Sequence, residues 1–115
     1  MKRKKNVLFV CHSNVSRSKT AERVFKGRYG MNTRSAGIAS WYGGLQIDEE
    51  LLSWADLVFV MEAEQKGYIR QRFPKMKKDI IVLDIPDIYN PMEKELVDEL
   101  KLKVIDRFGR WLDGK

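Results

Sequence analysis

The sequence is organised around one segment, Val7-Leu8-Phe9-Val10-Cys11-His12-Ser13-Asn14-Val15-Ser16-Arg17-Ser18. Its four leading apolar residues end on the only cysteine of the protein, and five residues separate that cysteine from an arginine. From Ser18 onwards, apolar residues recur at the spacing of a helix. We therefore predict a buried strand, a short loop that begins with a thiol, and a helix that starts beside a guanidinium group.

The remaining sequence alternates short apolar runs with amphipathic runs. The predicted strands are residues 6–10, 33–38, 57–61 and 80–83. The predicted helices are residues 18–29, 48–55, 62–73 and a long last helix with an apolar stripe at Val97, Leu100, Val104, Phe108 and Trp111. Continuously apolar strands that alternate with helices predict a three-layer α/β/α fold of the flavodoxin or Rossmann kind. We expect a four-stranded parallel sheet in the order 2-1-3-4.

The composition is that of one small globular domain, predicted to span residues 1–115. No apolar run reaches the roughly 20 residues of a membrane helix, so we expect a cytoplasmic protein without a membrane partner. The net charge of +6 is compatible with an anionic partner. Residues 2–5 supply four of the positive charges, however, and we expect residues 1–5 to form a basic, flexible tail. No zinc-finger spacing, aromatic RNA-binding motif or heptad run favours nucleic acid.

Cys11 is the only thiol, so an internal disulfide is excluded, and one cysteine with one histidine cannot form a structural zinc site. The five residues before Arg17 can curl so that backbone N–H groups converge on one point at the helix N-terminus. Such a nest fits a tetrahedral oxyanion, and an arginine can hold two of its oxygens. The same setting favours a thiolate, which Ser18 could stabilise by a hydrogen bond. The predicted phosphate-binding residues are His12, Ser13, Asn14, Val15, Ser16, Arg17 and Ser18.

A plainer alternative makes Cys11 a small buried residue at a strand end and Arg17 a surface residue. The loop after the fourth predicted strand supplies what a thiolate mechanism would still need, an acid for the departing oxygen and later a base for water. Asp84 and Asp87 lie on this loop, although either could merely cap a turn. Tyr89 could form an aromatic wall for a flat leaving group, or be a partly buried aromatic. The same two interpretations apply to Trp41 and Tyr42.

These residues resemble the low-molecular-weight protein tyrosine phosphatase family. The strand, loop and helix from Val7 onwards resemble its signature, and Ser35-Ala36-Gly37 resembles its second-strand motif. Pro86-Asp87-Ile88-Tyr89 resembles its general-acid loop, with Ile88 in place of the usual proline. The resemblance runs from residue 6 to the C-terminus.

The resemblance implies that Cys11 is the nucleophile, Arg17 the phosphate clamp and Asp87, two residues before the tyrosine, the general acid and base. It implies a phosphomonoester hydrolase of the protein tyrosine phosphatase kind, which works through a phosphocysteine without a metal or cofactor. Its substrates would be phosphorylated proteins or small aryl phosphates, with inorganic phosphate as product and inhibitor.

The sequence departs from the family pattern in three places. The segment between the Trp41 loop and the third strand is short, as in a compact subgroup. Ser16 stands where many members carry a second cysteine, and Lys19 where a proline often stands. Two alternatives on the same fold are a carrier that keeps phosphate on Cys11 and a phosphopeptide-binding module, whereas thiol-relay arsenate reduction would need further cysteines. An acid such as Asp87 distinguishes a hydrolase from a carrier.

Overall fold

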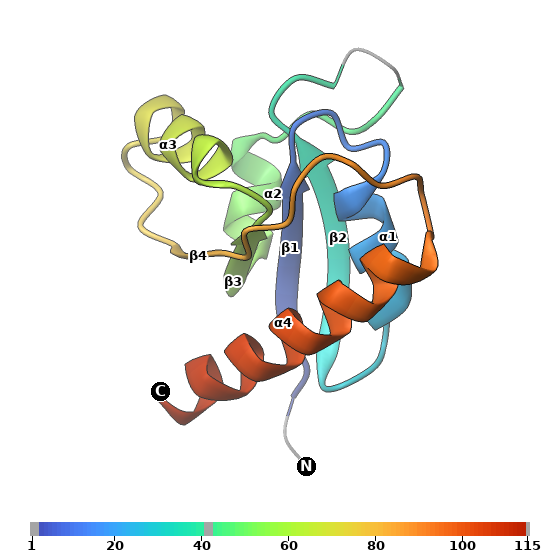
Figure 1. The fold of residues 1–115 in the computed structure, drawn as a ribbon. Helices are drawn as coiled ribbons and strands as arrows, with labels where there is room; N and C mark the ends of the chain where they lie inside the picture. Colours follow the sequence, from blue (N-terminus) through green and yellow to red (C-terminus); the bar gives the residue numbers. More distant parts are fainter. Residues whose placement is uncertain (1–2, 41–42, 115) are drawn as a thin grey trace.

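The computed structural model describes residues 3–40 and 43–114, which form a four-stranded parallel sheet with helices on both faces (Figure 1). The strands are β1 (Lys5–Cys11), β2 (Met31–Gly37), β3 (Leu57–Val60) and β4 (Asp79–Val82). The helices are α1 (Arg17–Phe25), α2 (Glu49–Trp54), α3 (Ala63–Arg72) and α4 (Lys94–Asp113). The strand order β2-β1-β3-β4 confirms the predicted fold class.

The alternation of side chains along β1 explains why this strand is apolar throughout. Successive residues of a strand point to opposite faces of the sheet. Val7 and Cys11 therefore join a cluster with α1 and α4, whereas Leu8 and Val10 join a second cluster with α2 and α3. Both faces of the sheet are covered, as expected for a parallel sheet.

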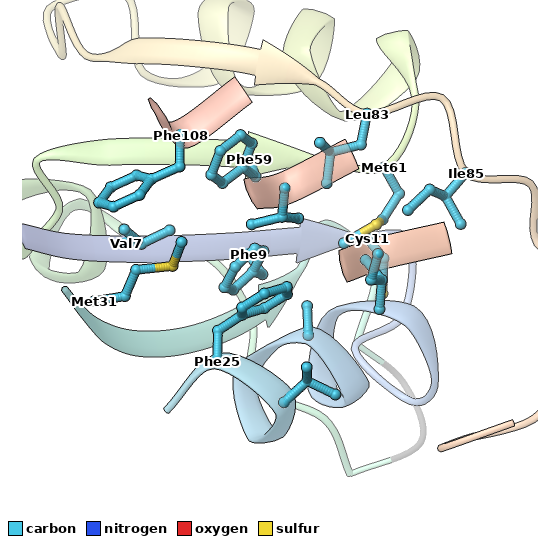
Figure 2. Close-up of a cluster of buried hydrophobic side chains, with 14 of the residues drawn as sticks. Val7, Phe9, Cys11, Phe25, Met31, Phe59, Met61, Leu83, Ile85 and Phe108 are labelled. Carbon is cyan, nitrogen blue, oxygen red and sulfur yellow. The ribbon is translucent and has the colours of Figure 1, made fainter. Parts of the chain in front are cut away.

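Aromatic side chains form the centre of the first cluster (Figure 2). The ring of Phe9 stacks on the rings of Phe25 and Phe59, with centroids 5.8 Å and 5.6 Å apart. Burial of a side chain of this size contributes on the order of 2 kcal/mol to folding. This packing fixes β1 between α1 and β3, and so fixes the position of Cys11 at the end of β1.

The loops that carry the candidate site residues leave the sheet at one edge, the upper edge in Figure 1. Parallel pairing continues to the ends of the strands, since the N–H of Met61 donates to the carbonyl of Val10 and the N–H of Leu83 to that of Val60. The N–H of Ile38 donates to the carbonyl of Cys11 in the same way. The loops after β1, β2 and β4 therefore meet beyond the carboxyl ends of the strands.

Helix α1 is shorter than predicted. It ends at Phe25, because Lys26 leaves the helical region and Gly27 adopts a φ of +69°. Tyr29, predicted to be the last apolar residue of the helix, lies in the turn with a φ of +54° and an exposed side chain. Its ring still meets that of Phe25 edge to face, so an apolar contact at helical spacing is made without a helix.

The ends of the chain differ slightly from the prediction. Lys5, assigned to the flexible tail, is the first residue of β1 and donates its N–H to the carbonyl of Gly30. In α4 the buried stripe is Leu96, Leu100, Val104 and Phe108, while Val97 and Trp111 are only partly buried. No helix in the described ranges is both long and apolar enough to cross a membrane.

Candidate active site

Cys11 is the last residue of β1, and the loop that follows bends around its sulfur. The side chain is buried, and Sγ accepts the backbone N–H of Asn14 at 3.2 Å. Asn14 has a φ of +58°, a left-handed conformation that asparagine tolerates better than most residues. This turn directs the backbone N–H back toward the strand end. The sulfur thus lies inside the curl that the sequence predicted.

Ser18, in the first turn of α1, is the second polar neighbour of the sulfur. Its Oγ lies 3.0 Å from Cys11 Sγ and also accepts a hydrogen bond from Asn14 Nδ2 at 2.7 Å. Ser18 keeps its hydroxyl hydrogen while it accepts from Asn14, so this hydrogen is available to the sulfur, and either atom of the sulfur–hydroxyl pair can be the donor. A hydroxyl donor in this position stabilises a thiolate more than a thiol.

The Asn14 side chain is itself fixed from two sides. Its Nδ2 donates to Ser35 Oγ at 3.0 Å, and its Oδ1 accepts the backbone N–H of Leu45 at 2.8 Å. Ser35 in turn donates to Glu22 Oε1 at 2.5 Å. Since the Ser35 hydrogen points to the Glu22 carboxylate, Ser35 can only accept from Asn14. The orientation of the amide, and through it that of Ser18, is therefore set by a carboxylate on α1.

Two glycines allow the loop after Cys11 to lie close to its neighbours. A Cβ at Gly37 would lie 2.8 Å from the backbone nitrogen of Asn14 and 2.8 Å from the carbonyl oxygen of His12. A Cβ at Gly44 would lie 2.5 Å from the carbonyl oxygen of Ser13. Such distances are shorter than any real contact of a methyl carbon with fixed backbone. The loop geometry thus requires these positions to be glycine.

Arg17 begins α1, and only 2% of its side chain is exposed. Its Nη1 donates to Glu62 Oε1 at 2.9 Å and to the carbonyl of Ile85 at 2.7 Å. Both anchoring bonds use Nη1, so a ligand can bind the edge formed by Nε and Nη2, on the side where the Asp87 carboxylate lies 3.6 Å from Nε. That edge is the one with which an arginine grips two oxygens.

Asp87 lies on the loop between β4 and α4, which crosses the sheet edge beside the loop after β1 (Figure 1). Its Oδ1 is 3.6 Å from Arg17 Nε, and its side chain is 67% exposed. Both residues line a cavity of about 270 Å³ together with Cys11, Ser13, Val15 and Ser16. A buried thiol, a buried guanidinium and an accessible carboxylate therefore share one hollow.

The comparisons with known proteins agree over nearly the whole chain. The low-molecular-weight protein-tyrosine-phosphatase Ptp of Acinetobacter johnsonii is 29% identical over 136 aligned positions, which cover 93% of this chain and 95% of that protein. The low-molecular-weight protein tyrosine phosphatase of T. tengcongensis is 26% identical, with a TM-score of 0.74 over 92% of this chain and 98% of that one. No protein-family model matches the chain.

The chain is a distant homologue of the low-molecular-weight protein tyrosine phosphatases. Two further solved structures share the fold. The YwlE arginine phosphatase of Geobacillus stearothermophilus is 24% identical, with a TM-score of 0.72 over 96% of this chain and 94% of that one. The tyrosine phosphatase Wzb of Escherichia coli K30, solved with phosphate, is 20% identical, with a TM-score of 0.74 over 94% and 98%. Proteins with this fold therefore include phosphatases of two substrate classes.

Within this family fold, the predicted wall residue Tyr89 lies outside the cavity lining, and the side chains of His12 and Asp84 lie outside it as well. Tyr89 does not line the cavity, because its ring packs against the core and its hydroxyl donates to Glu99 at 2.8 Å. The His12 side chain also points elsewhere, with Nδ1 3.5 Å from Glu64. Asp84 is exposed and lies outside the cavity lining, unlike Asp87. The predicted wall residues Trp41 and Tyr42 lie outside the described residues.

Sequence reasoning missed Glu62 as the partner of Arg17. Glu62 precedes α3 and forms a capping box with Gln65. Its carboxylate therefore lies just after the end of β3, where it accepts a hydrogen bond from the guanidinium of Arg17. The hydrogen bond from Arg17 holds the pKa of Glu62 below its usual value, although partial burial acts against this. The capping pattern Glu-x-x-Gln was visible in the sequence, but it did not indicate that the Glu62 carboxylate would bind Arg17, which is distant in the chain.

Proposed function

We propose that this chain is a phosphomonoester hydrolase that acts on phosphotyrosine-like esters through a phosphocysteine at Cys11. The observation that carries this proposal is the shared cavity in which Cys11, Arg17 and Asp87 meet. Each residue type suits one need of the reaction: a nucleophile, a holder for the phosphoryl oxygens and a proton donor. The whole of residues 1–115 would act as one catalytic domain.

The first step transfers the phosphoryl group to the thiolate of Cys11. The sulfur forms a bond to phosphorus while the ester P–O bond breaks, and Asp87 gives its proton to the departing oxygen. Arg17 and the backbone N–H groups of the loop after Cys11 hold the three remaining oxygens, where negative charge is concentrated. The helix N-terminus of α1 adds positive potential at the same point.

The second step returns the enzyme to its starting state. Asp87, now ionised, takes a proton from a water molecule, whose oxygen attacks phosphorus as the S–P bond breaks. The electron pair returns to sulfur, and inorganic phosphate leaves. The hydrogen bond from Ser18 stabilises the thiolate as it forms. One carboxylate therefore serves as acid and then as base.

Phosphotyrosine is favoured over phosphoarginine by the lining of the cavity. Val15 is 41% exposed and lines the hollow beside Cys11 and Asp87. An apolar side chain contacts an aryl ring favourably, whereas a guanidinium leaving group is better matched by polar acceptors. The structural likeness to an arginine phosphatase makes phosphoarginine the alternative to be tested.

The test compares the wild type, Cys11→Ser and Asp87→Ala on an aryl phosphate and on a phosphoarginine peptide. We expect the wild type to turn over the aryl phosphate, and Cys11→Ser to lose turnover. Asp87→Ala should slow hydrolysis by roughly 100-fold or more when the leaving group is a weak acid. If phosphoarginine is hydrolysed faster than the aryl phosphate, the proposed substrate class is wrong. If Cys11→Ser turns over as fast as the wild type, the thiolate mechanism is wrong.

A carrier function is the alternative from another class. A carrier must keep its phosphocysteine, whereas Asp87 stands within 3.6 Å of Arg17 at the edge of the cavity, where it can activate water. The same experiment distinguishes the two, because a carrier would accumulate phosphate on Cys11 and release none in the absence of an acceptor.

A further inference from the structure

The position of Asp87 depends on the backbone of its loop. In the described part of the chain, the charged partner of its carboxylate is Arg17, at 3.6 Å, and the side chain is two-thirds exposed. The residues around it, 84–92, form no helix or strand. The contacts that hold this loop in place therefore determine the position of the Asp87 carboxylate relative to the Cys11 sulfur.

The C-terminal side of the loop is held through Tyr89. Its hydroxyl donates to Glu99 Oε1 on α4 at 2.8 Å, and its ring packs against the core cluster. Its backbone carbonyl accepts the hydroxyl of Ser16 at 2.8 Å, which ties this point to the loop after Cys11. Tyr89 is thus turned inward by the fold and cannot at the same time contact a substrate in the cavity.

The N-terminal side of the loop is held through Lys103, one turn after Glu99 on α4. Lys103 Nζ donates to the carbonyl of Asp84 at 2.7 Å and to Glu99 Oε2 at 2.8 Å. Asp84 has a φ of +55°, a conformation that requires support from its surroundings. Glu99 and Lys103 are both three-quarters buried, so water screens their interactions less than those of surface pairs.

We propose that Glu99 and Lys103 are positioning residues that hold both ends of loop 84–92 on α4 and so fix Asp87 over the cavity. These two residues are called the clamp below. Tyr89 anchors the loop to them and is not a substrate contact. Glu99 links the two ends, because one of its oxygens accepts from Tyr89 and the other from Lys103. This inference rests on the proposed role of Asp87 as the general acid.

The clamp should affect proton transfer more than the other parts of the reaction. Catalytic groups must be held to within about 0.5 Å of their productive position. Release of either end would let Asp87 move by more than that. Cys11 stays at the end of β1, and Arg17 keeps its bonds to Glu62 and to Ile85, which is buried and donates its N–H to Met61. The loss should therefore appear with leaving groups that need a proton, and scarcely with those that leave readily as anions.

The experiment measures kcat and KM of Tyr89→Phe and Lys103→Met with para-nitrophenyl phosphate, an activated ester, and with an alkyl phosphate, whose leaving group needs a proton. We expect kcat/KM, which reports the transfer of the phosphoryl group to Cys11, to fall about tenfold or more for the alkyl ester and to change by less than about twofold for the activated ester. Tyr89→Phe keeps the ring, so loss of a wall contact cannot explain such a result. Lys103→Arg, which keeps donors and charge, should retain most of the activity.

Asp98→Asn is the matched control, since it breaks an exposed ion pair with Lys94 on the same helix. It should match the wild type with both esters. Because release of either end of the loop is enough to let Asp87 move, the double variant Tyr89→Phe/Lys103→Met should be scarcely worse than either single variant. Thermal unfolding of each variant separates a loss of fold from a loss of positioning.

Three outcomes decide the matter. A larger effect on KM than on kcat, or an equal loss of kcat/KM with both esters, would contradict the clamp. Tyr89 would then be a substrate contact or a purely structural residue. Wild-type kinetics in both single variants would also overturn the clamp. The proposed function would still stand in that case, provided that the wild type shows Cys11-dependent hydrolysis. Absence of any Cys11-dependent hydrolysis would instead overturn the proposed function, and the clamp with it.

Discussion

At the scale of single residues, the sulfur of Cys11 is surrounded by donors whose directions are fixed elsewhere. Asn14 donates to Ser18, whose own hydroxyl hydrogen remains available to the sulfur. Asn14 is oriented in turn by Ser35 and by the N–H of Leu45. The hydroxyl of Ser18 is therefore held in place to donate to a thiolate at Cys11.

This arrangement predicts the effect of Ser18→Ala. A hydrogen bond to a charged group contributes about 1.5–3 kcal/mol, so hydrolysis of the phosphocysteine should slow roughly 10- to 100-fold. Alkylation of Cys11 by iodoacetate at about pH 6 should slow as well, because less of the sulfur is a thiolate. Inorganic phosphate should protect Cys11 from alkylation in the wild type.

The control for this prediction is Ser53→Ala, which removes an exposed hydroxyl on α2, outside the cavity. It should leave both rates unchanged. Equal alkylation rates in Ser18→Ala and the wild type would mean that the hydroxyl near the sulfur does not stabilise the thiolate.

The sequence indicated the three residues that share the cavity better than the residues that support them. Cys11, Arg17 and Asp87 could be predicted because a thiol, a guanidinium and a carboxylate at these positions fit phosphate chemistry together better than they fit a purely structural role. Glu62 and Glu99 could not, because an acidic residue at a helix terminus or on a helix face is common. Their partners lie far along the chain and are known only from the fold.

At the scale of elements, two carboxylates tie separate parts of the site to the sheet and to α4. Glu62, at the start of α3, binds Arg17 of α1, and Glu99 of α4 binds Tyr89 and Lys103. Arg17 lowers the pKa of Glu62 from its ordinary value of 4.5. Burial would raise the pKa of Glu99, but the hydrogen bonds from Lys103 and Tyr89 outweigh it and leave that pKa lowered too.

These lowered values predict how stability depends on pH. A carboxyl whose pKa is lower in the folded protein contributes stability above the unfolded value, here 4.5, and loses it as pH falls through the folded value. Glu62→Gln and Glu99→Gln should therefore be less stable than the wild type at about pH 7. The differences should shrink toward about pH 3, where the wild-type carboxyls are protonated as well.

Denaturant unfolding at these pH values measures the free-energy differences directly. The control is Asp106→Asn, which removes an exposed carboxylate on the outer side of α4 and should show a smaller dependence. Differences that stay constant from about pH 7 to pH 3 would mean that the two carboxylates do not stabilise the fold through their charge.

The elements themselves were predictable to different degrees. Strands β1, β3 and β4 could be predicted well because each is an apolar run between polar residues, and their bounds differ from the prediction by one residue at one or both ends. Strand β2 was predicted less well, at residues 33–38, because its sequence is not continuously apolar. Helix α1 was predicted too long, because Tyr29 continues the apolar spacing of the helix although Gly27 turns the chain. The preference of Gly27 for positive φ outweighed the apolar pattern.

At the scale of the whole molecule, the candidate site is an edge of the sheet with supports from both layers. Strand β1 brings Cys11 to the edge, α1 and α3 hold Arg17, and α4 lies beneath the loop of Asp87. Between β2 and β3 the helix in the described residues is the six-residue α2. The parallel pairing of the strands and the edge at which the loops meet followed from the alternation of strands and helices.

The central claim is that phosphate passes through Cys11. The measurement that tests it most directly is the mass of the Cys11 peptide after acid quench of Asp87→Ala during turnover of para-nitrophenyl phosphate. We predict a peptide heavier by one phosphoryl group, which is absent without substrate and absent from Cys11→Ser. An unmodified Cys11 peptide during steady release of para-nitrophenol that requires Cys11 would contradict the claim, because phosphate would then reach water without passing through the sulfur.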